Sequence, residues 1–254
     1  MDFNFLETQL LNDYVPVPLS GTLSGHAAGE PFDKHVYEKL KNKFPNVVYR
    51  QFEYLNKLFE KNPKCKSYDT RANLIESETI KYLLMRGKSA TEDWSINNKF
   101  EEKQNDTADV LVIGESFKEE FNIIDVKTEN LSKKAQAPNI ISAEKLAKAC
   151  SLMIEYKDFN KVNIDYVGIG WEQIEGNLVC KEAFVRNLFK TPPNSLYINW
   201  TAAQQIQLHV KSFIQNFEGT KEEWCKKFIE HCYGSLQDNV AKKLKKFEYL
   251  KKYL

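Results

Sequence analysis

The sequence lacks a long apolar run, a paired cysteine motif and a secretory start. No stretch approaches the roughly 18 uninterrupted apolar residues that a membrane span needs, and the start of the chain has neither a basic head nor an apolar core. The five cysteines are scattered and odd in number, without a CxxC pair, which argues for reduced thiols and against a disulfide framework. We therefore expect a soluble, cytoplasmic protein.

A strong charge of one sign is also absent. Lys and Arg number 36 and Asp and Glu 35, so the whole chain has none of the basic field that many nucleic-acid binders use. Residues 221–254 differ, with nine Lys against five acids, and this excess fits either a solvated helix face or a phosphate-contacting surface. Cys225, His231 and Cys232 lie close together in the same region. Because a structural zinc takes four ligands, we interpret these three as helix-packing residues.

The chain has enough apolar residues for a large core, since 42% of its 254 residues are hydrophobic. Apolar residues at helical spacing predict a helix over 31–43, with Pro31 in its first turn. An ordered loop is expected before it, over 16–29. Residues 49–99 show mostly helical patterns, so the first part of the chain is predicted to be helical.

Strand patterns follow in the middle of the chain. Apolar runs at 108–113 and 121–127 predict a β-hairpin. A second strand pair is expected at 164–171 and 178–183, with a turn at Glu175-Gly176-Asn177. These two pairs predict a sheet at the centre of the fold.

Helices are expected to flank these strands. Residues 139–157 show amphipathic helical periodicity, and residues from about 201 to 254 show it again, with breaks expected at Gly219 and Gly234. Helices around a mixed sheet place the chain in the α/β (or α+β) class. We expect one domain over 1–254 whose last portion, about 201–254, is helical.

The strongest chemical signal lies on the first hairpin. Side chains alternate along a strand, so Asp125 and Lys127 project to one face and Val126 to the other. Asp109 begins the partner strand, where the hairpin would bring it beside Asp125. Asp106 is the competing acid, but it also fits a turn cap, and Asp109 directly abuts the apolar run. We take Asp109, Asp125 and Lys127 as the candidate catalytic residues.

Two carboxylates and a lysine at the end of a sheet suit a hard divalent cation. Mg²⁺ prefers oxygen ligands, keeps several waters and usually takes one or two protein carboxylates. Lys127 could then orient the water nucleophile, lower its pKa, or offset charge in the transition state, and the residue types leave these roles open. Glu30 and Glu38 could add an acid to a second metal position, although a helix-surface role fits them better. The pattern favours a nuclease, but a D-x-K triplet also occurs often by chance.

Longer motifs give a more specific match. In chain order they are GTLSGHAAGEPF at 21–32, RGKSATEDWSI at 86–96, FEEKQNDTAD at 100–109, DVKTENLSK at 125–133, AQAPNIISA at 135–143 and LYINW at 196–200. With these motifs the chain resembles the PD-(D/E)XK nuclease superfamily and, within it, the HincII family of type II restriction endonucleases. One departure is Ala108, which stands where the superfamily usually has a proline before its first acid.

The resemblance implies a restriction-endonuclease-like core, in which a mixed central sheet is flanked by helices, with helical additions. It implies a homodimer that uses Mg²⁺ to cut double-stranded DNA at a short palindromic site, GTYRAC, giving blunt ends with 5′-phosphates. Asp109 and Asp125 become metal ligands, the Val126 carbonyl adds a third, and Lys127 becomes the catalytic lysine. A cognate DNA methyltransferase is expected in the same system, though not as a physical partner.

The same resemblance indicates which residues read the DNA. Gln136 matches a glutamine that wedges into the DNA, Ala137 and Asn139 lie in the same segment, and Asn199 matches a base-contacting asparagine. The residue types agree, because Asn and Gln amides both donate to and accept from base edges, and flexible pyrimidine-purine steps reduce the cost of unstacking. Weaker candidates, for phosphate contact, are Lys88 and Thr128.

Besides a helical scaffold protein in which the D-x-K triplet is a coincidence, two alternatives remain open at this point. One is a repair or structure-specific nuclease of the same superfamily, which would cut according to DNA form. The other is a catalytically silent, sequence-specific DNA-binding protein. The intact pair of acids disfavours the second, because burying like charges together without a cation is costly.

Overall fold

The computed structural model describes residues 3–17, 26–104, 106–114, 120–133 and 136–253. Its helices are α1 Phe5–Leu10, α2 His26–Lys43, α3 Gln51–Glu60, α4 Tyr68–Ala72, α5 Glu78–Leu84, α6 Lys88–Glu92, α7 Ala143–Tyr156 and α8 Lys221–Lys246, with short 3-10 helices η2 Leu188–Lys190, η3 Pro193–Ser195, η4 Val210–Ser212 and η5 Glu248–Tyr253. Its strands are β1 Tyr14–Pro16, β2 Val48–Tyr49, β3 Val110–Val112, β4 Phe121–Asn130, β5 Asn139–Ser142, β6 Val162–Ile174, β7 Asn177–Asn187, β8 Ile198–Asn199 and β9 Gln205–Gln207. In these described ranges no helix is long and apolar enough to cross a membrane.

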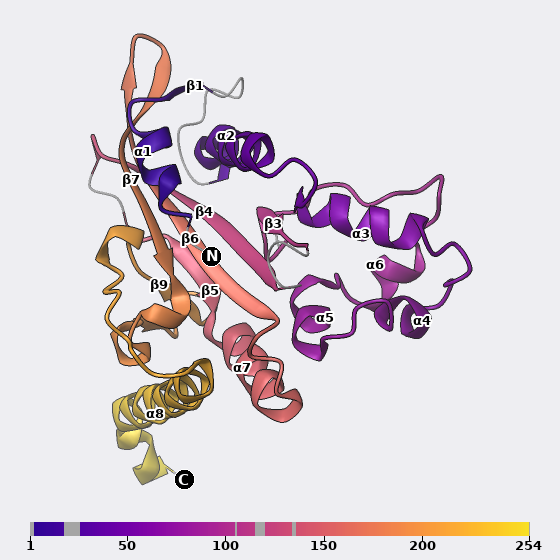
Figure 1. Ribbon diagram of the computed structural model, residues 1–254. Coiled ribbons are helices and arrows are strands. Elements are labelled where there is room, and N and C mark those ends of the chain that lie inside the picture. Colours follow the sequence, from indigo (N-terminus) through magenta and orange to yellow (C-terminus); the bar gives the residue numbers. More distant parts are fainter. Residues whose placement is uncertain (1–2, 18–25, 105, 115–119, 134–135, 254) are drawn as a thin grey trace.

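A six-stranded mixed sheet forms the centre of the molecule, in the order β1-β7-β6-β4-β3-β2. β4 and β6 run parallel, and the other neighbouring strands run antiparallel. α2 lies against one side of this sheet (Figure 1). The helices α3 to α7 lie on the other side and extend beyond the end of the sheet (Figure 1). A smaller sheet, β5-β9-β8, adjoins it. The expected class, a mixed sheet flanked by helices, is confirmed.

Alternation along β4 divides its side chains between two cores. Ile124 and Val126 pack in the core that contains α1 and α2, whereas Ile123 packs with α3, α5 and α7. Asp125 and Lys127 continue the face of Ile123, because side chains two apart point the same way. The expectation that Val126 points away from its two neighbours is confirmed.

Both expected strand pairs are present. β3 and β4 pair antiparallel, and residues 115–119, which connect them, lie outside the described residues. β6 and β7 are longer than expected and are joined by Glu175 and Gly176, whose φ angles are 49° and 81°. Two consecutive positive φ angles are what a two-residue hairpin turn needs to match the twist of its strands. Asn177, expected in the turn, therefore begins β7.

α2 begins earlier than the sequence pattern predicted. It starts at His26, so Pro31 lies inside the helix, and the prediction of a first-turn proline was wrong. Ala27 and Ala28 are strong helix formers and extend the helix upstream. Of the loop expected over 16–29, most lies outside the described residues, and its last part belongs to α2.

The helix expected over 139–157 is in part a strand. β5 occupies Asn139–Ser142, and α7 begins only at Ala143. Ser142 is the residue that sets this start, because its hydroxyl accepts a 3.1 Å hydrogen bond from the backbone N–H of Lys145. Such a cap needs an extended residue before the first helical turn, so the segment ahead of α7 is free to pair with β9.

The C-terminal portion is helical only in its second half. From about residue 201 the chain forms β9 and η4 before α8 begins. Thr220 caps α8 together with Glu223, each side chain accepting from the other's backbone N–H, which agrees with a break near Gly219. The break expected at Gly234 was wrong, because Gly234 lies inside α8. A helical glycine costs about 1 kcal/mol relative to alanine, which is too little to interrupt a helix of 26 residues.

Candidate active site

The antiparallel pairing of β3 and β4 brings Asp109 beside Asp125. The register places Val110 opposite Ile124, so Asp109, which precedes β3, lies level with Asp125. Oδ2 of Asp109 accepts a 2.6 Å hydrogen bond from the backbone N–H of Val126, and, in addition to burial, the charge of Asp109 contributes to raising the pKa of Asp125. The two acids that the strand pattern singled out are therefore neighbours at one end of the sheet.

Lys127 lies on the same face of β4 and contacts Asp125. Its Nζ donates a 2.8 Å hydrogen bond to Oδ1 of Asp125. Burial raises the pKa of Asp125 well above its usual range, and Lys127 only partly offsets that rise, to which Asp109 adds. Burial lowers the pKa of Lys127, but the charges of Asp125 and Asp109 outweigh it and raise the pKa. The lysine is thus held as a cation between carboxyl groups.

A third carboxyl group reaches the site from α2. Asp33 is only 8% exposed, and burial, followed by the charge of Asp109, raises its pKa. Its Oδ1 has no hydrogen-bond partner among the described residues. Sequence reasoning missed Asp33 and considered Glu30 and Glu38, which are exposed. The signal that could have found it is its place three residues before Val36, on the buried face of α2.

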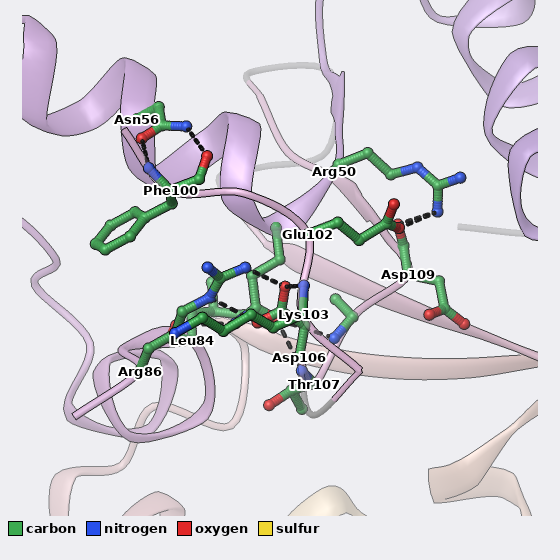
Figure 2. A network of polar contacts seen from close by, with 12 residues as sticks. Arg50, Asn56, Leu84, Arg86, Phe100, Glu102, Lys103, Asp106, Thr107 and Asp109 are labelled. Atoms are coloured by element: carbon green, nitrogen blue, oxygen red, sulfur yellow. Dashed lines mark hydrogen bonds and ion pairs between the residues drawn. The ribbon is translucent and has the colours of Figure 1, made fainter. Parts of the chain in front are cut away.

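Two residues at the start of α3 hold the segment that carries Asp109. Oε1 of Gln51 accepts from the backbone N–H groups of Thr107 at 2.8 Å and Ala108 at 3.0 Å. Nη1 of Arg50 donates to the backbone carbonyl of Asp109 at 3.0 Å, as Figure 2 shows. Neither Arg50 nor Gln51 was expected from the sequence, because nothing near them in the chain indicates a site.

Asp106, the competing acid, is engaged elsewhere. Nε of Arg86 donates to its Oδ1 at 2.7 Å, and Nη2 pairs with its Oδ2. Asp106 also accepts from the backbone N–H of Lys103 at 3.3 Å, which closes a turn. In Figure 2 the carboxyl group of Asp109 points away from the pair of Arg86 and Asp106. The structure therefore places Asp109, and not Asp106, beside Asp125.

A cavity of about 810 Å³ opens over these residues. Gln136 and Asn139 are exposed, and Thr128 is half-buried. These three, which the sequence resemblance selected for DNA contact, share the lining of this cavity with the acidic residues. Among its lining residues are Asp33, Asp109, Asp125, Lys127, Lys145, Thr128, Gln136 and Asn139.

Asn139 and Asn199 are linked through Gln207 across the small sheet. Nε2 of Gln207 donates to Oδ1 of Asn139 at 2.9 Å, and Nδ2 of Asn199 donates to Oε1 of Gln207 at 2.9 Å. Because Oδ1 of Asn199 also accepts from the backbone N–H of Thr201, the direction of this chain of amides is fixed. Gln207 was not expected from the sequence, because β9 was not recognised as a strand.

Three other residues expected to contact DNA, Ala137, Lys88 and Asn199, are not in the described lining of this cavity. Ala137 is half-buried between Gln136 and Asn139. Lys88 is exposed at the first residue of α6, and it does not belong to the described lining of the cavity. The structure therefore brings Thr128 and residues 136–139, here called the recognition segment, to the acidic residues but leaves Lys88 apart from them.

The cysteine and histidine group of α8 makes packing contacts. Cys225 is fully buried and interacts with Cys150 of α7. Nε2 of His231 forms a 2.9 Å hydrogen bond with the backbone carbonyl of Leu196. Wherever the chain is described, no three His, Cys, Asp or Glu side chains already stand together as a metal-binding group.

The groups at the end of the sheet fit a divalent cation completed by water. Asp109 and Asp125 supply oxygen donors, and the nearby carboxyl of Asp33 has a buried oxygen without a partner among the described residues. Burial raises the pKa of both Asp33 and Asp125 because the ionised groups are poorly compensated. A bound cation would offset that charge. Mg²⁺ in particular prefers to be coordinated by one or two carboxylates together with several water molecules.

Comparison with known proteins identifies the family. A family model described as restriction endonuclease HincII matches residues 6–254. The chain belongs to the HincII restriction endonuclease family. The type II restriction enzyme HindII of Haemophilus influenzae is 49% identical over 246 residues, which cover 96% of this chain and 94% of that enzyme. The type II restriction enzyme HincII of Haemophilus influenzae is 48% identical with the same coverage.

Family membership confirms the resemblance drawn from the sequence motifs. The chain is a type II restriction endonuclease, a site-specific deoxyribonuclease that hydrolyses phosphodiester bonds, and DNA is its class of substrate. Among solved structures, the NlaIV restriction endonuclease is 13% identical with a TM-score of 0.29, covering 81% of this chain and 89% of that one. So weak a likeness bears on neither fold nor function.

Proposed function

We propose that this endonuclease cuts both strands of DNA at the palindromic site GTYRAC, leaving blunt ends with 5′-phosphates, and that it requires Mg²⁺. The observation that carries the proposal is the pairing of Asp109 and Asp125 beside Lys127, in a cavity that Gln136 and Asn139 also line. The site sequence is carried over from the family resemblance. Its support is that the recognition segment lines the same cavity as the catalytic residues.

Asp109 and Asp125 hold the Mg²⁺ ion in this proposal, with the backbone carbonyl of Val126 as a further ligand. When bound, the ion polarises the phosphoryl group and acidifies water. The fold occupies Oδ2 of Asp109, through the N–H of Val126, and Oδ1 of Asp125, through Lys127. One oxygen of each carboxylate is therefore left for the ion, and neither hydrogen bond has to break when it binds.

Lys127 is the catalytic lysine in this proposal. Its ammonium group has three N–H donors, and one of them is used by Asp125 at 2.8 Å. The others can donate to a phosphate oxygen and to the attacking water. The lysine can thereby orient the water, lower its pKa or offset charge in the transition state. Its position next to Asp125 supports each of these roles.

The recognition segment reads the DNA. Gln136 inserts between base steps, with Ala137 and Asn139 beside it, and Asn199 contacts a base edge. Pyrimidine-purine steps unstack at low cost, so the degenerate centre of the site is read through its deformability. Phosphate contacts are assigned to Lys88 and Thr128.

A palindromic site is matched by a two-fold symmetric homodimer in which each copy cuts one strand. Each copy is one domain over residues 1–254. A cognate DNA methyltransferase protects the same site in the cell and makes no physical contact with the endonuclease. Cleavage of DNA that enters the cell places the enzyme in the cytoplasm.

Digestion of two matched plasmids tests this function. One plasmid carries a single GTYRAC site, and the other carries the same site changed at one base pair. We expect one blunt cut, located by sequencing the ends, only in the first plasmid and only with Mg²⁺. Cuts at another sequence would overturn the site, and cuts that follow DNA form would favour a structure-specific nuclease. Binding in Ca²⁺ without cleavage in Mg²⁺ would favour a silent DNA-binding protein.

Two variants test the assigned catalytic centre. We expect Asp125→Ala and Lys127→Ala to cut at least about 100-fold more slowly, the scale of loss when one transition-state contact is removed. Asp238→Ala and Lys148→Ala are matched controls, because both residues are exposed on helices away from the described lining of the cavity. If the first two variants cut as fast as the parent, the centre lies elsewhere.

A further inference from the structure

Lys145 also lines the cavity of the catalytic residues. It lies in the first turn of α7 and is half-buried. Its Nζ donates a 2.5 Å hydrogen bond to Oγ1 of Thr107, and that hydroxyl donates in turn to the backbone carbonyl of Leu83. Because the proton of Thr107 is committed to Leu83, its oxygen faces the lysine. The ammonium group is therefore held in place.

Among the described residues, Nζ of Lys145 makes the hydrogen bond to Thr107 and no ion pair. The two acids whose charges partly offset the effect of burial on the pKa of Lys145 already have partners, since Asp106 is paired with Arg86 and Asp125 with Lys127. Burial lowers the pKa of Lys145, more than Asp106 and Asp125 raise it. An unpaired, half-buried ammonium group is costly, and a negatively charged ligand would remove that cost.

We propose that Lys145 binds a phosphate of the DNA strand that enters this cavity, in addition to the catalytic Lys127. This inference rests on the proposed function, because it takes DNA as the occupant of the cavity. Lysine has three N–H donors, and Thr107 uses one of them. Two donors remain for phosphate oxygens, and a hydrogen bond between charged groups is among the stronger kinds.

The salt dependence of DNA binding isolates this contact. Each phosphate that a protein neutralises adds about 0.9 to the slope of log affinity against log salt. We expect Lys145→Met, which keeps the apolar stem and removes the charge, to lower the slope by about one. It should also weaken binding on the order of tenfold, as expected for a hydrogen bond to a charged group. Binding to a GTYRAC duplex is measured in Ca²⁺ over a range of roughly 50 to 200 mM salt.

Lys148 provides the matched control. It lies one turn further along α7, is exposed, and is not part of the described lining of the cavity. Lys148→Met should keep the slope of the parent, and so should Lys145→Arg, which keeps the charge. An unchanged slope in Lys145→Met, or an equal drop in Lys148→Met, overturns the assignment.

Thr107→Val separates a phosphate contact from an indirect effect through Thr107. The variant removes the hydroxyl that holds Lys145 and leaves the charge in the cavity, so we expect the slope of the parent. A drop equal to that of Lys145→Met means that the lysine acts only by positioning Thr107, which overturns the proposal. The parent protein reports separately on the proposed function, because a parent that neither binds nor cuts the duplex refutes that function itself.

Discussion

The backbone N–H of Val126 donates to the carboxylate of Asp109 over 2.6 Å. This bond ties the segment before β3 to the middle of β4 and places Asp109 level with Asp125. The position of the first acid is therefore set by the fold before any ligand binds. Arg50 and Gln51 hold the same segment from its other side, which supports a preorganised site.

Binding of a divalent cation should stabilise the protein. We expect Mg²⁺ or Ca²⁺ to raise the melting temperature of the parent and EDTA to reverse the rise, because a ligand at 100 times its Kd adds about 2.7 kcal/mol to the free energy of unfolding. Asp125→Asn should lose this response. Differential scanning calorimetry measures both effects.

Asp238→Asn is the control for this experiment. Asp238 is exposed on α8, so the variant should respond to Mg²⁺ as the parent does. A parent whose melting temperature is the same in saturating Mg²⁺ and in EDTA would contradict a metal site formed by Asp109 and Asp125.

Gln207 should matter for sequence discrimination although it was not expected from the sequence. Its side chain joins Asn139 to Asn199, and its removal leaves Oδ1 of Asn139 and Nδ2 of Asn199 without this partner. We expect Gln207→Ala to reduce the preference for the GTYRAC duplex over a one-base variant by about tenfold, which corresponds to one hydrogen-bonded base contact of about 1 to 3 kcal/mol. Competition binding in Ca²⁺ measures the ratio. Equal discrimination in Gln207→Ala and in the exposed control Gln237→Ala would contradict the role.

The parts of the site that the sequence predicted are those built from local pattern. Asp109, Asp125 and Lys127 lie on one hairpin, so alternation along a strand and one turn were enough to place them together. The turn at Glu175 and Gly176 was equally local. Each of these features depends only on residues within one hairpin. Such residues are close together in the sequence, so their pattern can be recognised without the structure.

The residues that were missed reach the site from distant parts of the chain. Asp33 and Gln51 come from helices of the N-terminal half, where a polar residue on a buried face has no partner nearby in sequence. β9 has one apolar residue between two glutamines, too short a pattern to separate from a loop. The prediction of a helix over 139–157 was wrong at its start. The four residues of β5 fit a helix and a strand equally well, and only their pairing with β9 decides between the two.

Asp165 should make stability depend on pH. It is 4% exposed on β6, and burial raises its pKa to about 6, although a hydrogen bond from Asn187 lowers it. Between about pH 4 and 6 the folded chain keeps a proton that the unfolded chain has released, so stability falls as pH rises through this window. The free energy of unfolding falls by at most about 3 kcal/mol over this window. Urea unfolding of the parent and of Asp165→Asn, compared across pH 4 to 8, isolates this contribution, and parallel curves would contradict it.

Substitution of Gly168 and of Gly234 by alanine should change the stability of the protein in opposite directions. A Cβ at Gly168 would stand 2.5 Å from Cβ of Val210, which no packed pair allows, and the buried strand or η4 must shift. Overpacking of this kind costs about 1 to 3 kcal/mol. A Cβ at Gly234 meets nothing within 4 Å, and alanine inside a helix is favoured over glycine by roughly 0.5 to 1 kcal/mol. We therefore expect the urea midpoint to fall for Gly168→Ala and to rise for Gly234→Ala. Because both changes add one methyl group, midpoints that move together would mean that neither the contact with Val210 nor the helical setting of Gly234 determines the outcome.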